Sequence, residues 1–525
     1  MTGSKSPNNF AVAAGDRHTA EAGREILEKG GNAYDAIVAM LWTATVTEPC
    51  LTSLGGGGFC LAKPADQEAK LFDFFVQTPR RKNLDQEIDF YPVEVDFGGA
   101  VQEFQVGRAT VATPGVVAGL FAIHQHYGRL PMKEVAQPAI RWAREGFKIT
   151  GFQTIAFQLL DPIFKATPES LRVFGKDDGN LVGEGDILKN PDLAQTIELL
   201  VEKGPEVFYR GELAEKIAAA AQTGGFLTKE DLENYQVKEK QPLSIDYRGA
   251  RFLTNSPPSA GGILIAFALK LLERVDWSKI KYLSAAYVEL LTEAMRQTQL
   301  ARRQKLDKNI YRPEIAAEFL DNEFQKSYAE KIEELLKINR WGSTTHLSVI
   351  DAEGNMASLT ATNGEGSGVV VPGTGIMLNN MLGEEDLNPH GFHQWPENKR
   401  LSSMMAPSLL LSPEIDLVVG SAGSNRIRSA ILQTIIRAFD YRLPLEEAVN
   451  GPRLHFENER LDLEPGFPEE TIVEIKEKKL TPEIQVWEDT SVFFGGANCV
   501  AHDKVANQYL AASDHRRSGV GLVNN

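Results

Sequence analysis

The stretch that decides the fold is residues 343–351, which read Ser-Thr-Thr-His-Leu-Ser-Val-Ile-Asp. Polar and apolar residues alternate along it, as they do in a strand with one buried face. Residues 352–354, Ala-Glu-Gly, follow as a three-residue loop with glycine where a left-handed backbone is favoured. Residues 355–362 alternate again. The two alternating segments predict a β-hairpin whose open end begins at Thr344.

The register of this hairpin brings two threonines together. With a three-residue loop, Asp351 faces Asn355, and the numbers of paired residues then sum to 706. Thr344 therefore faces Thr362 at the open end. A two-residue loop would place Asn363 opposite Thr344 instead, which is still a polar neighbour.

Thr344 can act as an activated nucleophile only after the bond before it is cut. A threonine hydroxyl needs a base, and a free terminal α-amine, with a pKa of about 7.7 to 8, supplies one within the same residue. The Thr344 hydroxyl could create that amine by attacking the carbonyl of Ser343 and forming an ester that water then opens. Two threonines at the start of a strand are also common for their β-propensity alone, and the hairpin by itself favours that structural interpretation.

Composition excludes several classes of protein. The chain has 525 residues, of which 42% are hydrophobic and 24% charged, as in a folded globular protein of several structural units. The formal net charge of -16 disfavours nucleic acid as a partner. Three distant cysteines predict neither a disulfide framework nor a zinc site. No membrane span and no signal peptide are recognisable, so we expect a cytoplasmic protein, or a periplasmic or secreted one if a leader has been removed.

Helical and strand-rich regions follow one another along the chain. Residues 19–46 predict two helices that are separated at Gly30-Gly31, with Asn32 as the N-cap of a fully buried second helix. Residues 115–336 are mainly helical in pattern, and short strands dominate after Trp341. The expected helices are 116–127, 132–145, 191–201, 212–220, 261–272, 285–305, 315–337, 429–439 and 468–478. This order predicts one layered α+β body.

Several segments resemble the γ-glutamyltransferase family of N-terminal nucleophile hydrolases, in the order in which that family has them. These segments are Gly30-Gly31-Asn32-Ala33-Tyr34-Asp35-Ala36, Leu54-Gly55-Gly56-Gly57-Gly58-Phe59, Thr113-Pro114-Gly115, Pro257-Pro258-Ser259-Ala260-Gly261-Gly262, Thr344-Thr345-His346, Leu378-Asn379-Asn380, Lys399-Arg400-Leu401-Ser402-Ser403-Met404, Gly420-Ser421-Ala422-Gly423-Ser424 and Pro452-Arg453. They extend over almost the whole chain.

The resemblance implies a four-layer αββα sandwich and a precursor that cuts itself. Residues 1–343 would form a large subunit, and residues 344–525 a small subunit that begins at Thr344. The expected activity is that of an amidohydrolase or acyltransferase, in which a small-molecule amide acylates Thr344 and the acyl group passes to water or to an amine. No cofactor or metal is implied, and a homodimer is left open.

The resemblance also assigns roles to particular residues. Thr362 corresponds to the threonine that orients the nucleophile. Gly423 and Ser424 correspond to the turn whose backbone N–H groups form the oxyanion hole. Ser402 and Ser403 correspond to the pair that binds the α-carboxylate of a γ-glutamyl substrate.

Three substrate-binding positions differ from the family pattern. Phe75 follows Phe72-Asp73-Phe74, where the family has an arginine that pairs with the substrate carboxylate, and an aromatic ring cannot replace that bidentate contact. Glu384 stands where the family has an aspartate that binds the substrate α-amino group. The family also has an asparagine two residues after the orienting threonine, whereas here Asn363 directly follows Thr362. Arg80 and Arg81 follow shortly after Phe75 and could substitute for the missing arginine, although such a pair is typical of a solvated surface.

Alternative functions remain beside γ-glutamyl transfer. The altered positions are compatible with an acylase for another acyl group, of the glutaryl, cephalosporin or oxamate kind. From another class, a non-cleaving small-molecule binding protein would share the fold. A nucleotide-binding loop at residues 55–58 is disfavoured because no Gly-Lys-Ser/Thr follows. A metal site at His390 and His393 is disfavoured because their spacing fixes no third ligand. We expect His346 to pack or hydrogen-bond beneath its strand.

Overall fold

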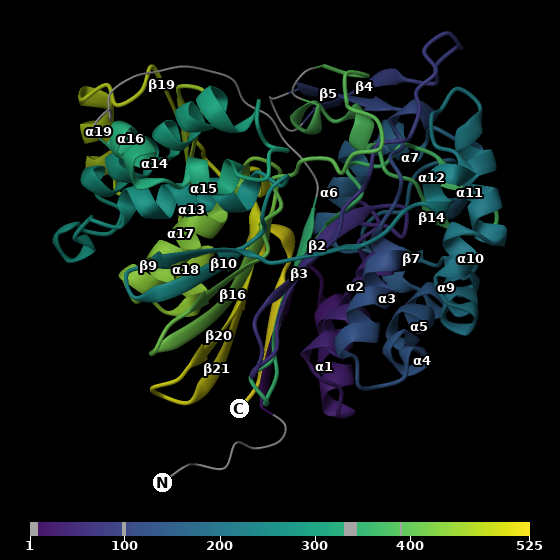
Figure 1. Cartoon of the computed structure of the whole chain (residues 1–525), viewed down its shortest axis with the longest axis horizontal. Coiled ribbons are helices and arrows are strands. Elements are labelled where there is room, and N and C mark those ends of the chain that lie inside the picture. Colours follow the sequence, from purple (N-terminus) through teal and green to yellow (C-terminus); the bar gives the residue numbers. More distant parts are fainter. Residues whose placement is uncertain (1–8, 97–100, 330–343, 389–390) are drawn as a thin grey trace.

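Two β-sheets lie face to face in the middle of the molecule, and helices cover the outer face of each sheet (Figure 1). This computed structural model describes residues 9–96, 101–329, 344–388 and 391–525, so Ser343 and His390 lie outside the described residues. The arrangement confirms the expected α+β class and the four-layer αββα sandwich.

The first sheet has seven strands, and the predicted hairpin lies near its centre. Every neighbouring pair in it is antiparallel. Its strands in spatial order are β22 (Val520–Asn524), β1 (Phe10–Ala14), β11 (Thr345–Ile350), β12 (Met356–Thr362), β2 (Gly57–Lys63), β3 (Lys70–Phe74) and β8 (Lys238–Lys240).

The register of β11 and β12 is the predicted one. Thr345 pairs with Ala361 and Ile350 with Met356, so paired numbers sum to 706. Gly354 in the connecting loop has a φ of 88°, the left-handed conformation that the sequence anticipated.

The two faces of β11 meet different layers. Leu347 and Val349 belong to the apolar core that the helices of the first layer complete. His346 and Ser348 point the other way, because successive side chains alternate in a strand, and they meet strands β16 and β20 of the second sheet.

The second sheet has six antiparallel strands. In spatial order they are β21 (Gln508–Ser513), β20 (Gly496–Asp503), β16 (Ile415–Ala422), β15 (Ser408–Leu411), β10 (Ala250–Thr254) and β9 (Leu243–Tyr247). Helices that cover or flank it are α13 (Gly261–Leu272), α14 (Ala285–Ala301), α17 (Arg426–Ile435), α18 (Leu445–Asn450) and α19 (Glu469–Glu477).

Most helices over the first sheet begin at the predicted residue, but the first begins at Arg17 instead of residue 19, and the helix expected over 132–145 is divided at Ala136. The principal ones are α1 (Arg17–Glu28), α2 (Ala33–Thr47), α3 (Val116–Tyr127), α5 (Gln137–Glu145), α9 (Pro191–Lys203) and α11 (Glu212–Gln222). Asn32 caps α2: its side chain accepts from the N–H groups of Tyr34 and Asp35, and the Asp35 carboxylate accepts from the N–H of Asn32. Every residue of α2 is buried, as its all-apolar pattern predicted.

Two further parts of the helical expectation for residues 115–336 were wrong. Residues 238–254 form β8, β9 and β10, and Arg248 and Gly249 join the last two strands with positive φ values of 49° and 80°. The helix expected over 315–337 is divided into α15 (Ile315–Phe319) and α16 (Asn322–Ala329), because Asp321 accepts from the N–H groups at the start of α16. Residues 330–337 of that expectation lie outside the described residues.

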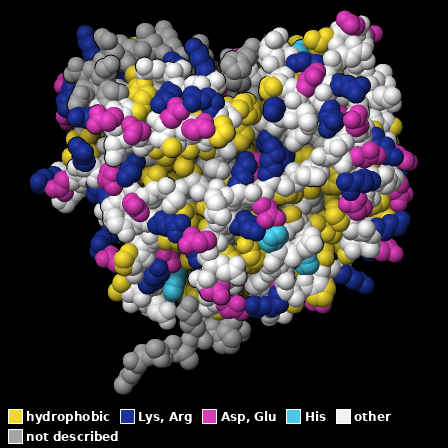
Figure 2. Space-filling model, viewed as in Figure 1, with side chains coloured by type: hydrophobic (Ala, Val, Ile, Leu, Met, Phe, Trp, Pro, Cys, Tyr) yellow, Lys and Arg dark blue, Asp and Glu magenta, His cyan; other side chains and the backbone are white. Residues whose placement is uncertain are grey.

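Charged side chains of both signs are interspersed over the face of the molecule in Figure 2. Among the described residues, no helix has both the length and the apolar character needed to cross a membrane.

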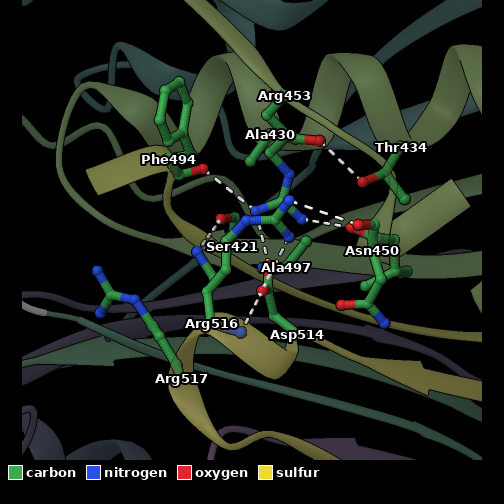
Figure 3. A network of polar contacts seen from close by, with 12 residues as sticks. Ser421, Ala430, Thr434, Asn450, Arg453, Phe494, Ala497, Asp514, Arg516 and Arg517 are labelled. Atoms are coloured by element: carbon green, nitrogen blue, oxygen red, sulfur yellow. Dashed lines mark hydrogen bonds and ion pairs between the residues drawn. The ribbon is translucent and has the colours of Figure 1, made fainter. Parts of the chain in front are cut away.

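A buried network of charges joins the second sheet to the C-terminal segment (Figure 3). Asp514 accepts from Arg453 Nη1 at 2.6 Å, from Arg516 Nη1 at 3.1 Å and from the backbone N–H of Ala497 at 2.8 Å. Arg516 also pairs with Glu464. Burial opposes ionisation of Asp514, but the two arginines overcome it and lower its pKa to about 2.

Replacing Asp514 with asparagine should destabilise the fold by about 3 to 5 kcal/mol at neutral pH, because two buried guanidinium groups lose their shared counter-charge. Urea unfolding of the purified protein measures this difference. Since the folded pKa lies below the ordinary value, the stabilisation is present above about pH 4 and should disappear as the pH falls toward 2. Asp177→Asn, at an exposed site, is the matched control and should change little. Equal unfolding midpoints for the two variants would contradict the assignment.

Candidate active site

Thr344 lies directly before β11, at the end of the central hairpin. The last residue pair of the observed register is Thr345 with Ala361, and extending it by one residue brings Thr344 opposite Thr362, the last residue of β12. Thr344 is 5% exposed. Its carbonyl oxygen accepts a long hydrogen bond, 3.5 Å, from Nη1 of Arg517. The nucleophile candidate is therefore held between the two sheets at their common end.

Thr362 and Asn363 turn the chain away from the strand. Oγ1 of Thr362 accepts from the N–H of Gly364 at 3.0 Å, which fixes the hydroxyl oxygen within the turn. The N–H of Asn363 donates to the carbonyl of Leu51 at 3.2 Å, and its Nδ2 donates to the carbonyl of Leu378 at 3.4 Å. Asn363 Oδ1 is buried and has no hydrogen-bond partner among the described residues.

The glycine run at residues 55–58 lies against this turn. A Cβ on Gly56 would come within 2.3 Å of the Thr362 carbonyl oxygen, and one on Gly57 within 2.7 Å of the Val76 nitrogen. The glycines thus allow neighbouring backbones to approach, which explains the run without a bound phosphate.

His346 lies beneath the strand, as expected from the sequence. Its ring nitrogens lie 2.8 Å from Oγ1 of Thr360 and 2.9 Å from Oγ of Ser348. Burial lowers the pKa of His346 to about 3, so the ring is neutral at physiological pH. Its two hydrogen bonds order the polar layer between the sheets, and the ring carries no positive charge there.

Gly423 and Ser424 form a tight turn after β16, with positive φ values of 110° and 46°. Neither backbone N–H of this turn has an acceptor among the described residues. The Ser424 hydroxyl donates to Asp386, and Asn425 Nδ2 lies 3.3 Å from both carboxylate oxygens of Asp386. Two N–H groups fixed in one turn are what an oxyanion site requires.

A small cavity lies between the nucleophile candidate and the end of β16. Its volume is about 10 Å³, and its lining includes Thr344, Ala422, Asn498, Asp514 and Arg517. Ala422 directly precedes the turn. The end of β16 and the start of β11 are therefore neighbours in space.

Ser402 and Ser403 lie in a segment that is held by hydrogen bonds from the motif at residues 257–262. The carbonyl of Ser403 accepts from the N–H groups of Ala260 and Gly261 at 2.8 and 3.1 Å, and from Oγ of Ser259 at 2.9 Å. Oγ of Ser403 accepts from the N–H of Met405 at 3.1 Å. Ser403 is buried, whereas Ser402 is partly exposed.

Glu384 lies beside the turn that follows Thr362. Its Oε1 would be 2.1 Å from a Cβ on Gly364, and it has no hydrogen-bond partner among the described residues. Burial, followed by repulsion from Glu365 and Asp386, raises the pKa of Glu384 well above its usual range. A cationic neighbour would stabilise the ionised form of Glu384 and lower its pKa.

Phe75 is fully buried and stacks on Phe59 with ring centroids 5.3 Å apart. Its carbonyl accepts from Tyr235 and from Arg400, whose guanidinium pairs with Asp73 at 3.2 Å. The arginine nearest to Phe75 is thus occupied within the protein.

The surface arginines do not fill the gap left at Phe75. Arg80 pairs with Glu230 at 3.2 Å, and Arg81 is exposed. Neither observation supports them as substitutes for the arginine that the family carries.

Three residues around the site escaped the sequence analysis: Glu48, Asp386 and Arg517. Glu48 accepts from Thr345 Oγ1 at 2.6 Å, Asp386 holds the Ser424 turn, and Arg517 contacts the Thr344 carbonyl. Glu48 ends a helix whose residues are otherwise uncharged after its first turn, which is the one signal that could have singled it out.

Comparisons with known sequences point to one family. The sequence matches the gamma-glutamyltranspeptidase family over residues 19–523. A glutathione hydrolase proenzyme from Escherichia coli strain K12 is 32% identical over 522 residues, covering 92% of this chain and 88% of the relative. An Acylase ACY 1 proenzyme from Pseudomonas sp. strain V22 is 31% identical over 471 residues, covering 85% and 82%.

Solved structures show the same likeness. Cephalosporin acylase from Bacillus halodurans has a TM-score of 0.85 at 26% identity, with 98% of this chain and 96% of that one covered. Gamma-glutamyltranspeptidase from Helicobacter pylori has a TM-score of 0.54 at 29% identity and covers 61% of this chain and 90% of its own. Because the family match spans nearly the whole sequence and the fold agrees over the same length, the chain belongs to the gamma-glutamyltranspeptidase family of N-terminal nucleophile hydrolases and is an enzyme of the amidohydrolase or acyltransferase type.

Proposed function

We propose that this chain is a precursor that cleaves itself between Ser343 and Thr344 and then uses Thr344 to open an amide bond. The observation that carries the proposal is the hairpin register, which, extended by one residue beyond Thr345 and Ala361, brings the buried Thr344 opposite Thr362; a cavity that Thr344 lines also reaches the end of β16. The products would be a large subunit, residues 1–343, and a small subunit, residues 344–525, held together by the two-sheet core.

Self-cleavage proceeds in two steps. Oγ1 of Thr344 attacks the carbonyl carbon of Ser343, the C–N bond breaks, and an ester and a free α-amine form. Water then hydrolyses the ester, which leaves a carboxylate on Ser343 and restores the Thr344 hydroxyl. The new amine is the base that the hydroxyl lacks within the precursor.

Turnover uses the same oxygen. The α-amine takes the proton from Thr344 Oγ1 as that oxygen attacks the substrate amide, and Thr362 orients the nucleophile. The N–H groups of Gly423 and Ser424 stabilise the oxyanion, each contributing about 2.7 to 4 kcal/mol. The departing amine receives the proton, and water or an amine acceptor then opens the acyl-enzyme.

The polar end of the acyl group would lie among Ser402, Ser403, Asn363 and Glu384. The serine hydroxyls offer donors for a carboxylate. Oε1 of Glu384 and Oδ1 of Asn363 offer acceptors for an ammonium group, since neither has a protein partner among the described residues.

Thr344→Ala should abolish both processing and turnover, because it removes the attacking oxygen. Denaturing electrophoresis after prolonged incubation should show the wild-type chain as fragments of 343 and 182 residues and the variant as one band of 525. Thr344→Ser keeps a hydroxyl and should still divide. Fragments from the alanine variant would place the nucleophile elsewhere, and an undivided wild-type chain would favour a non-cleaving binding protein.

A second candidate is an acylase whose acyl group is not γ-glutamyl. Phe75, buried against Phe59, stands where an arginine would pair with the substrate carboxylate, and Arg400 nearby is committed to Asp73. Similarity to proteins named acylases supports this reading as well.

Selectivity for γ-glutamyl amides should therefore be weak. Losing a bidentate arginine contact costs on the order of 2 to 5 kcal/mol of substrate binding. We expect kcat/KM for γ-glutamyl-p-nitroanilide to exceed that for the 4-aminobutyryl analogue, which keeps the amino group but lacks the α-carboxylate, by less than about tenfold. A panel of γ-glutamyl, 4-aminobutyryl, glutaryl, oxamyl and peptidyl amides, assayed on the processed protein, measures this ratio.

A γ-glutamyl preference of 1,000-fold or more, on the order of 4 kcal/mol, would contradict the acylase candidate. It would show that other residues bind the α-carboxylate as firmly as an arginine does.

A further inference from the structure

A buried carboxylate lies directly behind the proposed nucleophile. Glu48 follows α2 and is 4% exposed. Its Oε2 accepts from Oγ1 of Thr345 at 2.6 Å, and its Oε1 accepts from Oγ1 of Thr19 at 2.7 Å. One side chain thus ties the first residue of β11 to helix α1.

Arg517 contacts the same stretch of backbone. Its Nη1 is 3.5 Å from the Thr344 carbonyl oxygen. The Arg517 side chain lines the small cavity next to Thr344 and also a second cavity, of about 20 Å³, which Glu48 lines as well. Burial lowers the pKa of Arg517 to about 10, while Asp514 and Glu48 act against that shift, so the guanidinium remains charged at neutral pH.

The alternation of β11 explains why these two residues act on one peptide. Thr345 faces the helices, where Glu48 meets it, whereas Thr344 shares the orientation of His346 toward the second sheet. Fixing Thr345 from behind therefore limits how the peptide before it can rotate.

We propose that Glu48 is a positioning residue for self-cleavage before Thr344: its carboxylate anchors Thr345 and, with Arg517, holds the peptide that carries the nucleophile. This inference rests on the proposed function, since it concerns the same bond.

The ionised carboxylate is the form that fits the observed contacts. Two hydroxyls donate to it, and a carboxyl proton would compete with one of them. Burial first, and then the charge of Asp16, raises the pKa of Glu48 to about 7, although Thr345, Thr19 and Arg517 act against the rise. Self-cleavage should therefore slow as the pH falls through about 7.

The groups that β11 and the C-terminal segment place around Glu48 titrate far from pH 7, so they do not account for such a transition. From β11, Thr345 does not titrate in this range, and His346 points to the other sheet with a pKa of about 3. Arg517 and Asp514, from the C-terminal segment, have pKa values of about 10 and about 2.

Two ionisable groups precede or begin α1 on the side of Glu48. Asp16 caps that helix, accepting from the N–H groups of His18 and Thr19, and the His18 ring lies 3.1 Å from the Asp16 carboxylate. Among the described residues, His18 contacts the Asp16 carboxylate and makes no hydrogen bond or ion pair with Glu48. The precursor also lacks the terminal amine that would titrate near neutrality in the processed enzyme.

Glu48→Gln tests the proposal on the full-length chain. Precursor from brief cell-free synthesis is transferred to buffers between pH 5.5 and 9, and its division is followed by denaturing electrophoresis. The wild-type rate should rise roughly tenfold between pH 6 and pH 8, as expected for one group with a midpoint near 7. The glutamine variant should divide at about the low-pH rate of the wild type, with no transition in that range.

Asp440→Asn is the matched control. The side chain of Asp440 is also buried, with a pKa raised to about 6, but it accepts from the Tyr247 hydroxyl near Ile415, at the far end of β16. This variant should keep the wild-type profile. If it lost the transition as well, the proposal would be overturned, because the effect would belong to buried carboxylates in general.

Thr345→Val removes the same hydrogen bond by changing its donor, and it replaces Glu48→Gln as the test if that variant does not fold. It should slow division about tenfold at pH 8, whereas Thr345→Ser, which keeps the hydroxyl, should divide almost normally. A glutamine or valine variant with the wild-type rate and pH transition would overturn the role of Glu48 while leaving Thr344 as the nucleophile. A wild-type chain that never divides would instead overturn the proposed function.

Discussion

The antiparallel register of β11 and β12 is the constraint on which the rest of the site depends. A slip of one residue would exchange the two faces of the strand, so that Thr344 would point toward Glu48 and the helices. The slip is strongly disfavoured because Leu347 and Val349 would then leave their apolar core for the polar layer between the sheets. The hydrophobic pattern of a strand interior thus determines where a reactive hydroxyl points.

The layer between the sheets is unusually polar near this end, and it is stable because its groups pair with one another. His346 joins Thr360 and Ser348, and Asn498 donates to the His346 carbonyl at 2.7 Å. Gly420 on the facing strand leaves room for the imidazole, since a Cβ there would come within 2.2 Å of the ring. An unpaired group in such a position would cost about 1 to 3 kcal/mol, so the pairing fixes one arrangement of the sheets.

Local signals in the sequence predicted what local physics controls. The Asn32 cap, the buried helix after it and the hairpin at residues 345–362 all follow from short-range patterns. Strands β9 and β10 were missed because each has only five residues and the turn between them, Arg248-Gly249, carries one glycine in a helical neighbourhood. Asp321 was passed over as a cap inside an expected helix.

The candidate site was predictable only in part, for the same reason. Thr344 and Thr362 are related by hairpin geometry, whereas the contact between Thr345 and Glu48 joins residues 297 positions apart. The contact between Arg517 and Thr344 spans 173 positions. Such partners carry no periodic signature, and the resemblance to a family identifies them only where the family has a named motif.

The residues proposed for bond breaking and those proposed for substrate recognition lie in different parts of the molecule. Thr344, Thr362 and the turn at Gly423 lie at strand ends whose positions follow from the pairing of β11, β12 and β16. Ser402 and Glu384 lie in loops that side-chain and backbone hydrogen bonds hold, and such loops tolerate substitution more readily than strand pairings do. The altered residues at positions 75, 363 and 384 lie next to strands or in these loops, so acyl specificity can change while the arrangement around Thr344 is retained. Relatives that carry hydrolase and acylase names on one fold are what this separation would produce.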